Sequence, residues 1–441
     1  MSIIRISDRA MAVAGALSLS LAFSFGPTAT ADNWSNWRGP SQNGFSAEKD
    51  LPAEIKTKWK VEMPGSAAAT PIVHGDRVYI STTDEKAGNL VAMCLSASSG
   101  DILWKHVVAD GLSQDNRSNY ASNSPVTDGE RVIFFYGTGD LVAYDPSGSQ
   151  LWKRNIQDDH GAFSFLWTFS TSPALYKGKL YMQVLQRDEP VRGKGKKDAE
   201  SYILAIDPAS GRDIWKHIRP STANAESLEA FSTPVFHEHN GETQMIIVGG
   251  DVITGHDPET GNELWRWGTW NPTRIGHWRL VPSPVAGNGV ALACGPKGSP
   301  IYAVKLGLTG KLEDSNLAWD TDGERDLTSD VPTPAFAYND FFILSDVRNS
   351  LSRVDSATGK VKWTAELPRS KKWRASPTVA DGKIYILNHG GDFMVLDAGS
   401  GEKLAEQDFT EDEQDGIRSG VVISNGRFFI RTNTHLICAG S

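Results

Sequence analysis

The sequence predicts an all-β protein, an eight-bladed β-propeller of four-stranded antiparallel blades. Three observations predict it. A segment that ends in tryptophan recurs along the chain, a Ser/Thr-Pro strand start recurs in step with it, and strand-forming segments at the two ends complete one further repeat. Pairing of the N-terminal strand with the C-terminal blade would close the ring and remove the free sheet edges.

The tryptophan repeat is clearest in three segments. They read DPASGRDIW from Asp207, DPETGNELW from Asp257 and DSATGKVKW from Asp355. The aspartate can accept hydrogen bonds from amides two or three residues further on, and the glycine supplies a positive φ. A tryptophan in the following strand is large enough to bridge to the neighbouring blade. The residues at this phase are Trp59, Trp104, Trp152, Trp215, Trp265, Trp319 and Trp363, with Leu404 in the eighth position.

The strand starts share a Ser/Thr-Pro or related pair followed by a β-run. They are Ala69–Pro71, Asn123–Pro125, Thr171–Pro173, Ser232–Pro234, Pro282–Pro284, Pro332–Pro334 and Ala375–Pro377. Each start leads through tight turns into further short runs, which gives four antiparallel strands per unit. Seven starts against eight tryptophan-phase positions predict one split blade. Residues 55–63 would supply its fourth strand and residues 417–439 the other three.

The N-terminus predicts a cleaved secretory signal over residues 1–31. Arg5 and Arg9 precede an apolar run over residues 11–26, and small residues follow at 29–31. We therefore expect a signal peptide at 1–31, an N-terminal extension with the segment WRGP at 32–54, and a propeller at 55–441. No other stretch is apolar enough to span a membrane, so a periplasmic or secreted location without a membrane span after cleavage is predicted.

Composition excludes several classes of protein. The chain has 441 residues, of which 39% are hydrophobic, so a sizeable core is available. The net charge of −9 has the wrong sign for binding nucleic acid by phosphate neutralisation. Three separated cysteines, Cys94, Cys294 and Cys438, exclude a disulfide scaffold or a clustered zinc site. We expect a monomer.

The loops that join one blade's fourth strand to the next blade's first strand open on one face of a propeller. Here they are rich in arginine, tryptophan and carboxylates. A planar polycarboxylate would need an aromatic floor and Arg or Lys partners, and the same set suits a peptide, a sugar or an acidic partner. Solvated loops are the alternative. The candidate binding residues are Asn116, Arg117, Tyr120, Trp167, Arg274, His277, Trp278, Arg279, Lys371, Trp373, Arg374 and Arg418. Among them, the groups 274–279 and 371–374 are favoured.

Two charged segments are expected to be solvated loops. Residues 187–200 are basic and residues 411–415 are acidic. The basic segment could dock on an acidic surface.

The repeats resemble the tryptophan-docking repeats of the pyrroloquinoline quinone (PQQ) propeller superfamily over about residues 55–441. Trp34–Pro40 (WSNWRGP) and Asn43–Ser46 resemble the N-terminal signature of exported PQQ-like propellers. They are similar to BamB-like outer-membrane assembly proteins and to exported planctomycete-type PQQ-repeat proteins. The superfamily has a branch of non-catalytic scaffolds and a branch of quinone-dependent dehydrogenases. For the enzyme branch the resemblance implies PQQ, calcium held by Glu, Asn and Asp oxygens, an Asp base and a vicinal Cys-Cys pair. This sequence has no Cys-Cys dipeptide.

These observations favour an exported, non-catalytic PQQ-like propeller that acts as a protein-binding or assembly scaffold at the cell envelope, with a protein partner or a small ligand in the funnel. A PQQ-dependent alcohol or sugar dehydrogenase is the first alternative, and a saccharide-binding propeller is the second. The sequence assigns no catalytic residue, no metal ligands and no cofactor, although PQQ with calcium fits the first alternative.

Overall fold

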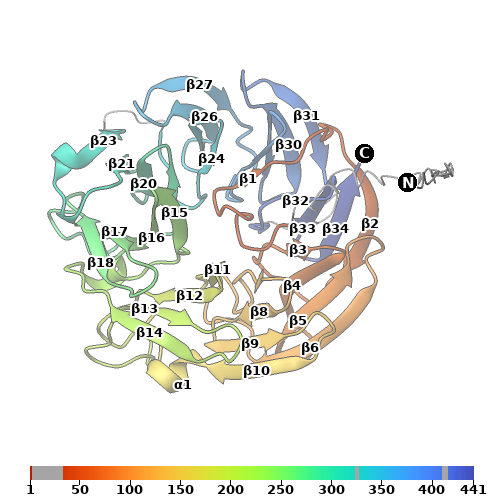
Figure 1. The fold of residues 1–441 in the computed structure, drawn as a ribbon, viewed down its shortest axis with the longest axis horizontal. Coiled ribbons are helices and arrows are strands. Elements are labelled where there is room, and N and C mark those ends of the chain that lie inside the picture. Colours follow the sequence, from red (N-terminus) through yellow and green to blue (C-terminus); the bar gives the residue numbers. More distant parts are fainter. Residues whose placement is uncertain (2–32, 323–326, 410–415) are drawn as a thin grey trace. The chain divides into compact units, whose positions relative to one another are not determined.

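The computed structural model describes Met1 and residues 33–322, 327–409 and 416–441. Residues 32–441 form one compact unit. The predicted signal segment and the acidic segment 411–415 lie outside the described residues. Within this unit the strands form eight sheets that follow one another in chain order around a ring (Figure 1). The predicted eight-bladed β-propeller is confirmed.

Each blade has four antiparallel strands that run from the central channel outward. The first four blades are formed by β3 (Ile72–His74), β4 (Arg77–Asp84), β5 (Asn89–Ser96) and β6 (Ile102–Asp110); β7 (Val126–Thr127), β8 (Val132–Phe135), β9 (Asp140–Tyr144) and β10 (Gln150–Asn155); β11 (Ala174–Tyr176), β12 (Lys179–Val184), β13 (Tyr202–Ile206) and β14 (Asp213–Ile218); and β15 (Val235–His239), β16 (Glu242–Gly249), β17 (Val252–His256) and β18 (Glu263–Trp267), with β22 (Gly310–Lys311) added outside β18.

The other four blades are formed by β19 (Val285–Gly287), β20 (Val290–Cys294), β21 (Ile301–Lys305) and β23 (Leu317–Asp320); β24 (Ala335–Ala337), β25 (Asp340–Ser345), β26 (Ser350–Asp355) and β27 (Val361–Glu366); β28 (Thr378–Ala380), β29 (Lys383–Leu387), β30 (Asp392–Asp397) and β31 (Lys403–Asp408), with β1 (Phe45–Ser46) added inside β28; and β32 (Val422–Ser424), β33 (Arg427–Arg431), β34 (His435–Gly440) and β2 (Lys56–Glu62). The short helices are α1 (Ile156–His160) and the 3₁₀ turns η1 (Ala225–Leu228) and η2 (Asp314–Asn316).

The ring closes as the sequence predicts. Strand β2 pairs antiparallel with β34, and Trp59 lies opposite Cys438. The last blade therefore takes three strands from the C-terminus and its outermost strand from near the N-terminus, so no sheet edge is left open at the junction.

The docking tryptophans lie at a β-bulge and pack on the turn of the next blade. In each of the eight described blades the register between the third and fourth strands shifts near the tryptophan phase, and such a bulge re-aims a side chain. Trp363 is typical. Its Nε1 donates to the carbonyl of Ala398 at 3.2 Å, and its ring lies so close to Gly401 that a Cβ there would sit 2.7 Å away. Six tryptophans face a positive-φ glycine in this way: Trp59, Trp104, Trp152, Trp215, Trp319 and Trp363.

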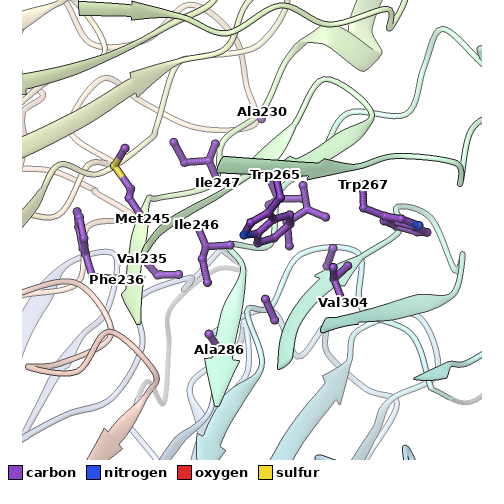
Figure 2. Packing of buried hydrophobic residues seen from close by; sticks show 14 of the residues in the cluster. Ala230, Val235, Phe236, Met245, Ile246, Ile247, Trp265, Trp267, Ala286 and Val304 are labelled. Atoms are coloured by element: carbon purple, nitrogen blue, oxygen red, sulfur yellow. The ribbon is translucent and has the colours of Figure 1, made fainter. Parts of the chain in front are cut away.

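Trp265 is the exception. The following blade lacks the regular aspartate turn, and β22 pairs there with β18 instead. The indole packs on Gly255 of its own blade and donates to Gln244 Oε1 at 2.8 Å. Figure 2 shows it among the aliphatic side chains of a cluster that includes Ile246 and Val304. It still contributes to the seam with the following blade, although by a different contact.

The hydrophobic core is divided among the seams between blades rather than gathered at one centre. One cluster joins the first two blades through residues such as Tyr79 and Phe134. Another joins the last blade to the first through Phe429 and Val78. Most of the burial that stabilises the fold therefore depends on neighbouring blades being in place.

The Ser/Thr-Pro starts form a hydrogen-bonded ring around the channel. The amide of Ser283 donates to Thr333 Oγ1 at 2.9 Å, and the amide of Thr333 donates to Ser376 Oγ at 3.0 Å. The same contact recurs from Thr70 to Ser124, from Ser124 to Ser172 and from Thr233 to Ser283, and the amide of Gly420 donates to Thr70 Oγ1. Each hydroxyl thus satisfies a buried backbone amide of the preceding blade.

The N-terminal extension lines the channel instead of lying outside the propeller. The carbonyl oxygens of Trp34 and Ser35 accept from the amides of Val73 and Thr127, and the side chains of Asn36 and Gln42 accept from the amides of Leu175 and Phe236. β1 adds to β28, so this one segment contacts the innermost strands of several blades. We call residues 33–48 the plug.

Arg38 fixes the plug. Its Nη1 donates to the carbonyl of Pro377 at 2.7 Å and its Nη2 to that of Pro334 at 3.1 Å. The side chain is 3% exposed, and burial lowers its pKa to about 9. Gly44 allows this approach, because a Cβ there would overlap Arg38 Nη2. No helix among the described residues is long and apolar enough to cross a membrane.

Candidate functional site

One face of the propeller gathers the loops that leave the outermost strands and the loops between second and third strands. We call it the mouth face. Contacts across blades hold these loops together. Lys194, from the β12–β13 loop, lies with its Nζ 3.0 Å from Tyr120 Oη in the β6–β7 loop. The plug contacts the innermost strands that these loops lead into.

Trp167 is the aromatic centre of the mouth face. Its Nε1 donates to Glu226 Oε1 at 2.9 Å. The guanidinium of Arg117 lies 5.6 Å from the ring centroid and that of Arg192 lies 5.5 Å from it. Both distances suit cation–π attraction. The indole is therefore already engaged by two cations and one carboxylate.

A chain of alternating charges continues round the mouth. Glu226 Oε1 lies 3.8 Å from Arg279 Nε, and Arg279 Nη2 lies 3.8 Å from Asp330 Oδ2. The amide of Asp330 donates to Asp346 Oδ1 at 3.0 Å, and Arg374 Nε donates to Asp346 Oδ2 at 3.1 Å. Asp346 is 2% exposed, and burial raises its pKa. The structure thus brings the predicted residues Arg279 and Arg374 into one network, joined by carboxylates.

Glu229 is the most buried acid of the mouth face. It is fully buried. Its Oε1 accepts from Arg187 Nε and from the amide of Leu166, whereas its Oε2 has no partner among the described residues. Burial raises its pKa to about 7, despite the opposing effect of the Arg187 charge.

A pocket of about 300 Å³ opens where the loops of the last and the first two blades meet. It brings together the predicted residues Asn116, Arg117 and Arg418, although Arg418 follows Arg117 by 301 positions in the chain. Arg418 is half-buried, and burial followed by the positive charges of Arg374 and Arg117 lowers its pKa.

Other predicted residues lie apart from this pocket. Trp373 is fully buried in the seam between the sixth and seventh blades and donates to the carbonyl of Pro368 at 2.9 Å, so it is a packing residue. Arg274 is exposed and donates to the carbonyl of Thr222. His277 is exposed, and its carbonyl accepts from Lys297 Nζ. Trp278 is half-buried. The side chain of Lys371 lies over Gly390.

Sequence reasoning missed several participants. Glu229 and Asp346 are buried and Arg187 is half-buried, and none of the three was among the candidate binding residues, because their positions in the sequence carry no repeat signal. The basic segment was expected to be a solvated loop, and here Arg192 and Lys194 contact Trp167 and Tyr120. The signal for the plug was Arg38 in the WRGP segment. This segment places one cation between a tryptophan and two turn-forming residues, Gly39 and Pro40.

The donor set that calcium and a quinone would need was tested on these residues. The mouth-face carboxylates are each engaged: Glu229 by Arg187, Asp346 by Arg374, and Glu226 by Trp167 and Arg279. No group of three or more His, Cys, Asp or Glu side chains in the described ranges is arranged to hold a metal ion. All three cysteines are free, buried and far apart in the sequence. Among the described residues, therefore, no calcium ligands and no vicinal cysteine pair are assigned.

Comparison with known proteins gives relatives of two kinds. The chain is 28% identical over 270 residues to a polyvinylalcohol dehydrogenase from Pseudomonas sp, a match that covers 54% of this chain and 40% of that protein. The chain thus spans about two fifths of the length of the curated relatives it matches.

Two solved structures share the fold. A quinohemoprotein alcohol dehydrogenase from Comamonas testosteroni superposes with a TM-score of 0.63 at 13% identity, covering 93% of this chain and 81% of that one. BamB from Moraxella catarrhalis superposes with a TM-score of 0.57 at 12% identity, covering 88% of this chain and 100% of that one. At such identities the likeness shows the fold alone.

A family model described as outer membrane protein assembly factor BamB matches residues 53–187 and 249–439, which is well over half of the chain. The matched ranges contain most of the docking tryptophans and the ring-closing strand, the features on which the propeller depends. The chain therefore belongs to this family of PQQ-like propellers.

Proposed function

We propose that the protein is a non-catalytic binding propeller that holds a protein partner at the cell envelope through its mouth face. One observation carries the proposal: Glu226, Glu229 and Asp346 each contact an arginine, while the side chains of Arg117, Arg192 and Arg418 have no ion pair among the described residues. Such a face favours recognition of a ligand that carries acceptor oxygens. Membership of the BamB-described family supports a partner in an envelope assembly.

A quinone-dependent dehydrogenase is the second candidate. The match to polyvinylalcohol dehydrogenase favours it, although this match covers about half of the chain. The two candidates differ in their requirement for a cofactor. The purified protein would be mixed with PQQ and calcium and assayed with an artificial electron acceptor against small alcohols, sugars and polyvinyl alcohol. We expect no turnover and no saturable change in the quinone absorbance. Saturable binding with turnover would overturn the scaffold proposal.

The positive test of the proposal is site-specific photo-crosslinking in cells of the source organism. A photo-reactive phenylalanine replaces Arg274, which is exposed on the mouth face and outside the pocket. The matched control replaces Val107, which is 58% exposed on the outer strand β6. We expect a discrete protein adduct in the envelope fraction from position 274 and none from position 107. Equal labelling from both positions, or none from either, would contradict a specific partner at this face.

A further inference from the structure

The pocket between the last and first two blades is built mainly from hydrogen-bond donors and cations. Loops from four places in the chain form it: one ahead of β3, one between β6 and β7, one ahead of β32 and one between β33 and β34. Asn116 and Ser118 contribute an amide and a hydroxyl, and Arg117 and Arg418 contribute guanidiniums. Such a lining suits a ligand that carries acceptor oxygens.

Asp115 is the single carboxylate of the pocket lining, and both of its oxygens are used by backbone and hydroxyl groups. Oδ2 accepts from the amide and the Oγ1 of Thr168, and Oδ1 accepts from the amide of Arg117 at 2.6 Å. This carboxylate fastens the β6–β7 loop to the loop that follows β10. It does not pair with the guanidinium of Arg117, so among the described residues no carboxylate of the pocket lining forms an ion pair with Arg117 or Arg418.

The positive charges of Arg117 and Arg418 meet in this pocket. Neither Arg117 nor Arg418 has an ion pair within the described ranges, and Arg418 Nη1 donates to the carbonyl of Gly416 at 3.0 Å. Arg418 lies close enough to Arg117 and Arg374 for both charges to act on it. Arg374 is paired with Asp346, but Arg117 and Arg418 are like charges that line one pocket, and their repulsion in this partly buried setting is only partly screened. An anion placed between them would relieve it.

The positive surface continues beyond the pocket. Arg117 and Arg192 both lie over Trp167, and Lys194 lies over Tyr120 at 5.7 Å from the ring centroid. Arg418, Arg117, Arg192 and Lys194 therefore form a band across the loops of the last blade and the second and third blades. We call it the cationic band. Because the whole chain carries a net charge of −9, this band stands out as a local reversal of sign.

The band favours a peptide over a saccharide. Sugar rings bind by stacking on open aromatic faces, but Trp167 is engaged by two guanidiniums and a carboxylate, and Tyr120 is covered by Lys194. Guanidinium forks pair with carboxylates in a bidentate way. A chain with several carboxylates spaced along it could contact the pocket and the band together.

We propose that the pocket and the cationic band bind an acidic peptide segment of the partner protein, whose carboxylates pair with Arg117 and Arg418 in the pocket. This inference rests on the proposed function as a protein-binding scaffold. It names the chemistry of the partner, a run of Asp or Glu residues in an extended segment.

The test uses a short fluorescein-labelled peptide of alternating Asp and Gly, and a matched peptide with Asn in place of Asp. Binding to the purified protein is followed by fluorescence anisotropy at low and at physiological salt. We expect saturable binding of the Asp peptide, weakening with salt, and at least about tenfold weaker binding of the Asn peptide. Equal binding of the two peptides would overturn the proposal.

The variants locate the site. Arg117→Gln and Arg418→Gln should each weaken binding of the Asp peptide by about tenfold, and Arg418→Lys should restore part of the loss because it restores charge. Lys60→Gln, on the exposed outer strand β2, is the matched control and should change nothing. Since Arg117 is exposed, its replacement should leave the thermal unfolding curve unchanged. Unchanged affinity in the Arg117/Arg418 double variant would overturn the assignment.

Two further outcomes distinguish an acidic peptide from an acidic saccharide, and failure of this inference from failure of the proposed function. Tighter binding of an oligogalacturonate than of the Asp peptide, lost in the same variants, would replace the peptide with an acidic saccharide and so overturn the proposal. If the peptide fails to bind while the crosslink from position 274 persists, the scaffold function stands and this inference falls. Loss of the crosslink would instead count against the function itself.

Discussion

The contact between a docking tryptophan and a turn glycine is the smallest unit of this fold. Gly401 has φ +78° and lies against Trp363, whereas Gly426 has φ +68° and no atom within 4 Å of a Cβ placed on it. The two positions share the backbone conformation but differ in packing. They therefore separate the cost of a left-handed conformation from the cost of crowding the tryptophan.

Replacing the two glycines by alanine should have unequal effects. Gly426→Ala should lower the free energy of unfolding by about 1 kcal/mol, from the positive φ alone. Gly401→Ala should lower it by about 3 kcal/mol, because the added methyl also displaces the Trp363 ring. Chemical denaturation of the two variants measures both values. Equal losses would show that the tryptophan contact contributes nothing at this seam.

Glu229 ties the stability of the mouth face to pH. Its pKa lies at about 7 in the folded protein, raised by burial from a usual value near 4.5. A group whose folded pKa is raised contributes stability that is fully present below its unfolded pKa and is lost as pH rises through the folded pKa.

The free energy of unfolding of the wild type should therefore fall relative to Glu229→Gln as pH rises from about 4.5 to about 7, by about 3 kcal/mol in total. Denaturant titrations of both proteins across that range give the difference directly. Glu62→Gln, on the exposed strand β2, is the control and should show no such trend. A difference that is constant with pH would mean that Glu229 is not held in its protonated form.

At the scale of elements, the innermost strands are joined by hydroxyls rather than by a continuous sheet. Ser283 accepts from the amide of Thr233 and donates its own amide to Thr333. Gly420 stands at the equivalent position in the last blade and has no hydroxyl. A Cβ there would meet Ser376 O at 3.5 Å, an ordinary contact, so a serine fits.

Substitutions at Ser283 and Gly420 should change the free energy of unfolding in opposite directions. Ser283→Ala should lower the free energy of unfolding by about 1–2 kcal/mol, because it leaves the buried amide of Thr233 without its acceptor. Gly420→Ser should raise it by up to about 1 kcal/mol, from reduced freedom of the unfolded chain and a new acceptor hydroxyl. Gly420→Ala is the control for chain freedom, and a serine that stabilises no more than the alanine would refute the role of the hydroxyl.

The plug is the second element that joins blades at the channel. Arg38 bridges carbonyls of the sixth and seventh blades, while Asn36 and Gln42 satisfy amides of the third and fourth. The plug thus occupies space between the innermost strands of these blades. The WRGP segment thus contacts the strand starts at Pro334 and Pro377 but does not form part of the mouth face.

At the scale of the whole molecule, the ring is held closed by strand β2 and the plug together. Removal of residues 33–48 should lower the melting temperature by several degrees but leave one cooperative transition, because the eight blades keep all four strands. Removal of residues 33–62 takes β2 as well and exposes the edge of β34.

The longer truncation should therefore lose the single transition and associate, as unprotected edges do. Calorimetry and size-exclusion chromatography of the two truncated proteins measure these outcomes. A cooperative, monomeric transition in the longer truncation would show that closure by β2 is not required.

The sequence by itself determined the number of blades, the split last blade and six of the seven predicted docking tryptophans, those that pack on the turn of the next blade. These features repeat with a fixed spacing, and each depends on a turn and a strand that lie within a few residues of one another, so the pattern is visible locally. The exception at Trp265 was not visible, because it depends on β22, a strand that the degraded repeat contributes from a later part of the chain.

Only the tertiary structure decided where the plug goes and which loop residues meet. Arg38 and Pro377 are 339 positions apart, and Arg117 and Arg418 reach one pocket from opposite ends of the chain. Trp373 and Trp167 lie in similar loops in the sequence, yet the first is sealed in a seam and the second lies beneath two cations. Ring closure sets these outcomes, because it brings together loops whose sequences carry no periodic signal.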